Sequence, residues 1–164
     1  MRYRLRHIAK DLLEELTKAD ESHLRGVAVA VCNLAVERSG LKSPVVNEAM
    51  QYLLRWQAVP AGTQADLEDL VDQLDAKYFD AKDAAEAAGE GDENWHRAFH
   101  KARAAAAVLF ACNEDPVRAA AESAFEANAA AHDDTAALRK VISESLHRKG
   151  DGHVSTGLGD EGGN

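Results

Sequence analysis

Residues 95–131 read WHRAFHKARAAAAVLFACNEDPVRAAAESAFEANAAA, and this stretch decides the fold. Fifteen of the thirty-four residues from Ala98 to Ala131 are alanine. Alanine is the strongest helix former because it loses no side-chain entropy when a helix forms. The motif Asn113-Glu-Asp-Pro116 interrupts the run. The stretch therefore predicts two helices that approach each other closely, because most of their side chains are small.

Apolar side chains recur at helical spacing along the rest of the chain up to residue 149. They predict helices over residues 3–18, 22–38, 43–56, 63–89, 92–113, 116–131 and 135–149. The sequence thus predicts an all-α domain over residues 1–149, with six or seven helices in an antiparallel bundle or an irregular helical array. Residues 150–164 are rich in glycine and have little to bury, so we expect a disordered tail there.

Several residues are suited to the ends of these helices. Asp20 or Ser22, Ser43 and Thr63 can cap helix N-termini, with Pro44 at a first helical position. Gly40 suits the left-handed residue that follows a helix. One alternative stays open for residues 27–36, where valines alternate as in a buried strand. A helix is favoured, because Leu24, Val27, Val31, Leu34 and Ala35 lie on one helical stripe.

The overall charge and the apolar segments limit the classes of function. The net charge is −9, which disfavours nucleic acid and anionic membranes as partners. The most apolar window, Val27–Val36, has about half the length of a membrane span, and no signal peptide is visible. We therefore expect a cytoplasmic protein. Cys32 and Cys112 lie within helical patterns and are expected to be free thiols.

Negative charge is concentrated on the predicted helix 63–89. From Thr63 to Glu93 there are eleven carboxylates against only Lys77 and Lys82. Such a face is often simply solvated, but it can also attract a basic protein and accelerate its association. The leading hypothesis is therefore an interaction protein that binds a basic partner through this helix, by the residues Glu68, Asp69, Asp72, Asp80 and Asp83.

Histidines suggest a different function, metal binding. His96 and His100 are four residues apart and so share one helical face. Two Glu-x-x-His pairs are also present, a pattern that di-metal bundles use on facing helices. The alternative hypothesis is therefore a helical metal-binding protein or metalloenzyme that uses Glu93, His96, His100, Glu144 and His147. Here the pairs fall at the ends of their helices, where a core site is disfavoured.

No motif for nucleophilic catalysis or for phosphate binding is present, so the sequence favours a non-enzymatic protein without a cofactor. The basic arm Arg2–His7 is short, and nucleic-acid binding through it is not favoured in an acidic protein. A structural or oligomer-forming helical module is a third hypothesis. The sequence leaves the oligomeric state and the identity of any partner open.

Two stretches carry a resemblance to a known class of protein. They are Cys32-Asn-Leu-Ala-Val-Glu-Arg38 with Pro44-Val-Val-Asn-Glu-Ala-Met-Gln-Tyr-Leu-Leu-Arg-Trp56, and the alanine-rich segment 99–131. In their helical texture they resemble the all-helical predicted immunity proteins of bacterial toxin systems, over about two thirds of the chain. The resemblance implies a non-enzymatic protein that binds and neutralises a toxin, and an acidic helix would suit a cationic, nuclease-type toxin.

Overall fold

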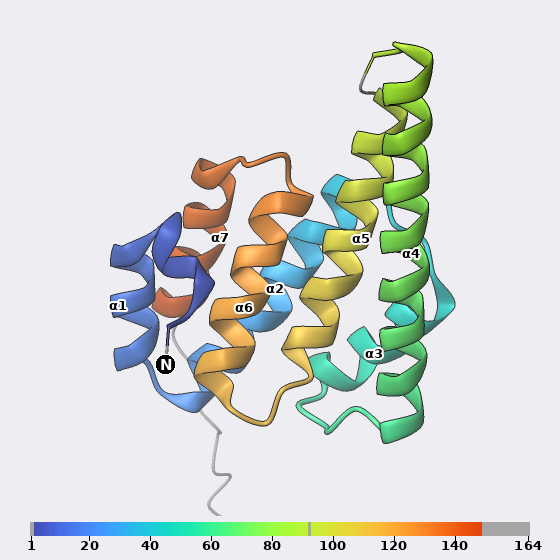
Figure 1. The fold of residues 1–164 in the computed structure, drawn as a ribbon. Coiled ribbons are helices and arrows are strands. Elements are labelled where there is room, and N and C mark those ends of the chain that lie inside the picture. Colours follow the sequence, from blue (N-terminus) through green and yellow to red (C-terminus); the bar gives the residue numbers. More distant parts are fainter. Residues whose placement is uncertain (1, 92, 149–164) are drawn as a thin grey trace, which may run out of the picture.

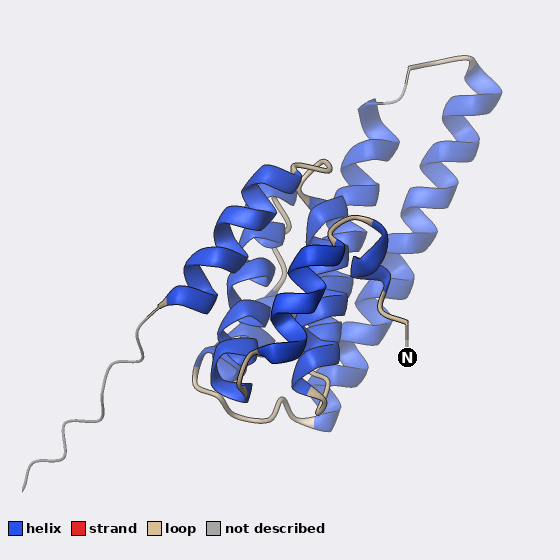
Figure 2. Ribbon diagram, turned by 90° about the vertical axis from the view of Figure 1, so that its left-hand side faces the viewer, coloured by secondary structure: helices blue, strands red, loops and turns tan. Residues whose placement is uncertain are grey.

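The computed structural model describes residues 2–91 and 93–148, apart from the side chain of Glu93. These residues form helices joined by turns and loops, and they contain no strand (Figure 2). The helices are η1 (Arg4–His7, a 3-10 helix), α1 (Lys10–Lys18), α2 (Glu21–Ser39), α3 (Pro44–Leu54), α4 (Ala61–Ala88), α5 (Glu93–Ala111), α6 (Pro116–Ala130) and α7 (Thr135–His147). The all-α prediction is confirmed, and the predicted tail 150–164 lies outside the described residues.

Helix α2 is the centre of the array and contacts α3, α5, α6 and α7 (Figure 1). At its N-terminal end, Arg25 donates to the main-chain oxygens of Asn113 and Glu114, each at 2.7 Å. At its C-terminal end, Arg38 lies 3.4 Å from Asp134. Helix α2 therefore runs antiparallel to α5 and parallel to α6. The strand alternative for residues 27–36 is wrong, because the stripe Leu24, Val27, Val31 is buried as one helix face.

The alanine-rich stretch forms the antiparallel pair α5 and α6 that the sequence predicts. Its buried alanines include Ala104, Ala107, Ala120 and Ala124, all fully excluded from solvent. Close approach brings the Ser123 hydroxyl on α6 to 2.8 Å from the main-chain oxygen of Ala107 on α5. This hydrogen bond satisfies a hydroxyl that would otherwise be costly to bury.

The predicted first helix over residues 3–18 is wrong in its first half. The chain forms η1, changes direction at Ile8 and Ala9, and only then begins α1. The break is explained by two tertiary contacts. Leu5 is fully buried, and the main-chain nitrogen of Arg4 donates to Glu122 at 3.1 Å. A straight helix from residue 3 would place these groups elsewhere.

Three of the predicted helix ends are formed by aspartate caps. Asp20 accepts from the His23 nitrogen, Asp115 from the nitrogens of Val117 and Arg118, and Asp134 from the Ala137 nitrogen. Two glycines follow helices in the left-handed conformation, Gly40 at φ 67° and Gly89 at φ 64°, where glycine lacks the steric cost that a Cβ atom imposes.

Ser43 occupies the N-cap position of α3 and Pro44 begins the helix, as predicted, although the Ser43 hydroxyl accepts no capping hydrogen bond. The cap predicted at Thr63 is wrong. Thr63 lies inside α4, which already begins at Ala61, and its hydroxyl lies 3.3 Å from Glu48. The helix predicted over residues 43–56 extends too far, because α3 ends at Leu54 and Trp56 lies beyond it, 59% exposed.

Helices α4 and α5 form a hairpin that extends past the other helices (Figure 1). At 1.5 Å per residue, the 28 residues of α4 span about 42 Å. Aromatic rings join the projecting part, since Tyr78 lies 5.9 Å from Trp95 and 5.2 Å from Phe99 between ring centroids. Within the described residues, no helix is both long and apolar enough to cross a membrane.

Candidate functional site

The outward face of α4 carries the five carboxylates that the sequence singles out. Glu68, Asp69, Asp72, Asp80 and Asp83 are all exposed to solvent. Leu67 and Leu74, on the opposite side of the helix, are buried against the rest of the molecule. Within the described residues, none of the five carboxylates makes an ion pair or a side-chain hydrogen bond. Their charge is therefore directed to solvent, and no cation in the described part of the chain neutralises it.

An aromatic side chain that the sequence analysis missed lies among these carboxylates. Phe79 is 57% exposed and one helical turn from Asp83. Its ring lies 4.9 Å from that of Tyr78, at an interplanar angle of 47°. Tyr78 in turn contacts α5, so the exposed ring rests on a fixed support. The signal in the sequence was a phenylalanine at an outward position of a helix whose seam is otherwise leucine, tyrosine and alanine.

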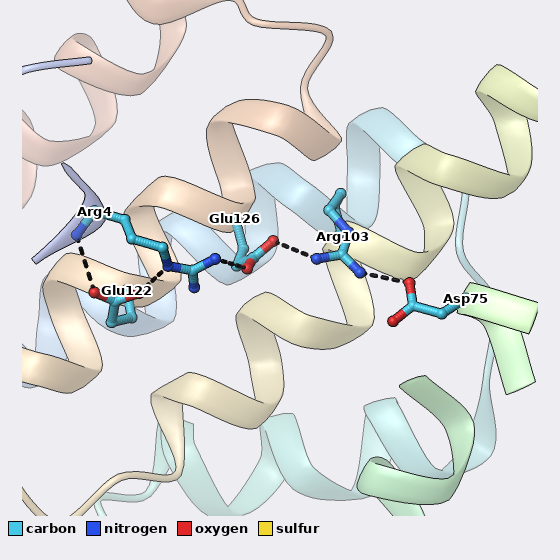
Figure 3. A network of polar contacts seen from close by, with 5 residues as sticks. All are labelled: Arg4, Asp75, Arg103, Glu122 and Glu126. Carbon is cyan, nitrogen blue, oxygen red and sulfur yellow. Dashed lines mark hydrogen bonds and ion pairs between the residues drawn. The ribbon is translucent and has the colours of Figure 1, made fainter. Parts of the chain in front are cut away.

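A chain of ion pairs runs from α4 through the molecule to η1 (Figure 3). Arg103 on α5 contacts Asp75 on α4 at 2.5 Å and Glu126 on α6 at 3.0 Å. The same Glu126 carboxylate contacts Arg4 at 2.7 Å. Arg4 also contacts Glu122 through its Nε atom at 2.6 Å. The network therefore joins four helices. Within it Asp75 is paired with Arg103, unlike the five outward carboxylates of the same helix.

The burial of its two glutamates indicates that this network stabilises the fold. The side chains of Glu122 and Glu126 are 9% and 2% exposed, and a buried carboxylate without a cation is strongly destabilising. Arg4 supplies that cation while its guanidinium carbon lies 4.5 Å from the Phe125 ring centroid. The arginine nitrogens without a hydrogen-bond partner among the described residues, Nη2 of Arg4 and Nε of Arg103, are buried. Both guanidinium groups also contact phenylalanine rings, and these contacts offset part of the free-energy cost of burying nitrogens that lack a hydrogen-bond partner.

This network was not predicted from the sequence. The available signal was the pair Glu122 and Glu126, one turn apart in a helix that otherwise carries mainly alanine. Two carboxylates on a face destined for burial require a cation from elsewhere in the chain. Nothing local to α6 specifies that the cations come from residues 4 and 103.

The structure does not bring together the residues of the metal hypothesis. His96 and His100 lie near the start of α5, with ring centroids 6.2 Å apart. Glu144 and His147 lie at the end of α7, close to the start of α2, where His23 meets the Arg148 oxygen at 3.4 Å. Because α2 and α5 are antiparallel, His96 and His100 lie at the opposite end of the array from Glu144 and His147. The two sets of side chains therefore cannot bind the same metal ion. The Glu93 side chain lies outside the described residues.

A different residue, His132, approaches His100. Their ring centroids are 3.7 Å apart, and His132 occupies a turn in which it and Asp133 have left-handed backbones, at φ 59° and 58°. Burial and the neighbouring imidazoles of His132 and His96 lower the pKa of His100, while Asp133 opposes that effect. Among the described residues, no three histidine, cysteine or acidic side chains are arranged to hold a metal ion.

Both cysteines are free thiols, as predicted. Cys32 is fully buried, and burial raises the pKa of its thiol. Burial likewise raises the pKa of Cys112 to about 11. The thiolate is the reactive form of cysteine, so these pKa values disfavour nucleophilic chemistry at either residue.

Comparison with models of protein families, with curated proteins and with solved structures gives no match for this chain.

Proposed function

We propose that this protein binds a basic protein partner through the outward face of α4. The observation that carries the proposal is the contrast between two sets of carboxylates. Asp75, Glu122 and Glu126 are used inside the molecule. Glu68, Asp69, Asp72, Asp80 and Asp83 are exposed and unpaired within the described residues, where mutual repulsion on one helix is a cost to folding.

Phe79 gives this face an apolar anchor. Binding energy at protein interfaces is concentrated in a few aromatic or arginine side chains, surrounded by polar contacts that exclude water. A partner arginine can stack on the Phe79 ring and contact Asp83 at the same time. The charges then accelerate association, and the ring slows dissociation. The partner class that the immunity-protein resemblance implies, a cationic toxin of the nuclease type, has the appropriate charge.

The test uses the immobilised full chain as bait for a partner encoded beside its gene. We expect capture at low salt and loss of capture at high salt, because screening weakens exposed charge pairs. Reversal of Asp69, Asp72, Asp80 and Asp83 to lysine should abolish capture. A matched control reverses four exposed acids on other helices, Glu14, Glu15, Glu37 and Glu144, and should retain it.

The anchor is tested separately. Phe79→Ala should weaken binding by about tenfold or more, the effect of truncating an interface anchor, while leaving the salt dependence in place. Undiminished capture after the four-site reversal on α4 would overturn the proposal, because the control variant has the same net charge. Equal loss in both variants would show a response to total charge without a defined binding face.

A further inference from the structure

Positive charge gathers around a hollow of about 570 Å³ where α3 begins beside α4 and α5. The lining comes from three parts of the chain, which are the segment 40–44, α4 and α5. Among the described residues that line it, four are cationic and none is acidic, although the chain has 28 acidic residues against 19 basic ones. We call it the cationic hollow, and its cations are Lys42, Lys77, Arg97 and Lys101.

The cations of this hollow are not used inside the molecule. Within the described residues, none of the four side chains makes an ion pair or a hydrogen bond. This contrasts with Arg4 and Arg103, which are held by buried carboxylates. Arg97 and Lys101 lie one turn apart on α5, where like charges repel each other at a cost to folding. An anion in the cationic hollow would offset that repulsion.

A buried hydroxyl without a partner lines the same hollow. Ser43 is 9% exposed, and its hydroxyl makes no hydrogen bond with any described residue. A hydroxyl that is withdrawn from water without a partner carries a free-energy cost. Because Ser43 lines the cationic hollow, a ligand there can supply the missing partner.

The start of α3 adds main-chain donors at the same place. Ser43 and Pro44 line the hollow, so the N-terminus of α3 lies at its edge. The main-chain nitrogens of Val45 and Val46 have no acceptor among the described residues. Amides in the first turn of a helix point out along its axis, where they and the helix dipole favour a bound phosphate. These donors supplement the cationic side chains, most of which come from other helices.

The charge and the walls of the hollow define the class of anion. Four cations exceed the charge of a single phosphate group, so a ligand with more than one phosphate group complements them better. Leu70 and Leu74 form apolar walls between the cations, and apolar surroundings strengthen interactions between charges. The outward carboxylates of α4 would repel a long polyanion that extended beyond the hollow. The arrangement therefore favours a compact ligand over a nucleic acid.

We propose that the cationic hollow binds a compact small molecule that carries two or more phosphate groups. From α5, Arg97 and Lys101 contact phosphate oxygens. Lys77 contacts them from α4, and Lys42 and Ser43 do so from the residues that precede α3. The site is independent of the outward face of α4, because none of the five carboxylates of that face lines the hollow.

The probe is sodium tripolyphosphate, titrated into the full chain at constant ionic strength with chloride as the balancing anion. We expect saturable NMR shifts for the amides of Ser43, Val45 and Val46 and of residues 97–101. The dissociation constant should be at least about tenfold lower than that of inorganic phosphate, because more phosphate oxygens meet cations. The thermal unfolding temperature should rise in the same series, since a ligand that binds only the folded chain stabilises it.

Variants of the protein locate the site. Arg97→Gln combined with Lys101→Gln should weaken tripolyphosphate binding by at least about tenfold. The matched control, Arg6→Gln with Lys18→Gln, removes the same charge from exposed positions on η1 and α1 and should leave binding within about twofold. Ser43→Ala loses no capping hydrogen bond, so it should keep the thermal stability of the natural chain and weaken binding by about tenfold.

Two further ligands test the class of anion. Triglutamate carries several carboxylates and no phosphate, and it should bind at least about tenfold more weakly than tripolyphosphate. A single-stranded oligonucleotide of ten thymidines should also bind more weakly, because the acids of α4 repel the part that extends beyond the hollow.

The proposal is overturned by the absence of saturable shifts, by equal binding in the two double variants, or by triglutamate binding as tightly as tripolyphosphate. Tighter binding of the oligonucleotide would assign this surface to nucleic acid and would also overturn it. Every variant here keeps the outward carboxylates of α4. Failure of this proposal is therefore distinguishable from failure of the proposed function.

Discussion

The Arg103 guanidinium on α5 lies 3.0 Å from the carboxylate of Glu126 on α6, whose side chain is only 2% exposed. Because Arg4 occupies the other oxygen of that carboxylate at 2.7 Å, one buried charge is held by cations from two distant parts of the chain. The N-terminal segment is thereby tied to the alanine-rich pair. Stability of the fold and placement of η1 therefore depend on the same side chain.

Replacement of Glu126 should be among the most destabilising substitutions in this protein. Glu126→Gln keeps the shape but leaves the guanidinium groups of Arg4 and Arg103 with one carboxylate fewer. We expect a loss of about 3 kcal/mol in the free energy of unfolding, as when one partner of a buried pair is removed. Urea denaturation measures it. Glu37→Gln, at an exposed site on α2, should change stability by less than about 0.5 kcal/mol.

The alanine-rich pair should not tolerate larger side chains. Ala120 on α6 is fully buried, so Ala120→Leu should force neighbouring helices apart and cost about 1–3 kcal/mol. Ala84, on α4, is exposed, and Ala84→Leu should be nearly neutral. Thermal unfolding of both variants compares them directly. Equal stabilities would mean that α5 and α6 are not closely packed.

The pair between Asp11 on α1 and Arg139 on α7 should contribute a pH-dependent term to stability. The Arg139 guanidinium lowers the pKa of Asp11 from 3.8 to about 2. Because the folded-state pKa is below the unfolded value, the contribution is present above pH 3.8 and is lost as the pH falls through about 2. Asp11→Asn should therefore reduce stability at neutral pH, and the difference from the natural protein should shrink below pH 4. A constant difference down to pH 2 would contradict the assignment.

His100 should make the fold sensitive to mild acid. Its pKa is lowered, chiefly by burial and then by His132 and His96. A histidine whose folded-state pKa lies below its ordinary value of about 6.5 favours folding above that value and opposes it as the pH falls further. His100→Phe should flatten the decline of stability as the pH falls below about 6.5. His23 should act in the opposite sense, because its hydrogen bond to Asp20 raises its pKa. NMR titration of the imidazole signals measures both directions.

Most of the helices could be predicted from the sequence, because helix formation depends on neighbours within one or two turns. The alanine-rich pair, the aspartate caps at 20, 115 and 134, and the left-handed glycines at 40 and 89 follow from such local rules. The errors occur where a distant contact competes with a local preference. Arg4 leaves the predicted first helix for Glu122, and Thr63 points its hydroxyl at Glu48 and does not cap α4.

The acidic character of α4 was likewise determined by the sequence alone, because acids such as Asp69, Asp72, Asp80 and Asp83 occur at spacings that place them on one side of a helix. Only the tertiary structure decided which acids remain available to a partner. Asp75 and Asp72 differ little in their local context, yet Asp75 is paired with Arg103 and Asp72 is exposed without a partner among the described residues. The two Glu-x-x-His pairs are similarly alike in sequence, and packing places them at opposite ends. Local pattern fixes which way a side chain faces on its own helix, whereas only packing determines what lies opposite it.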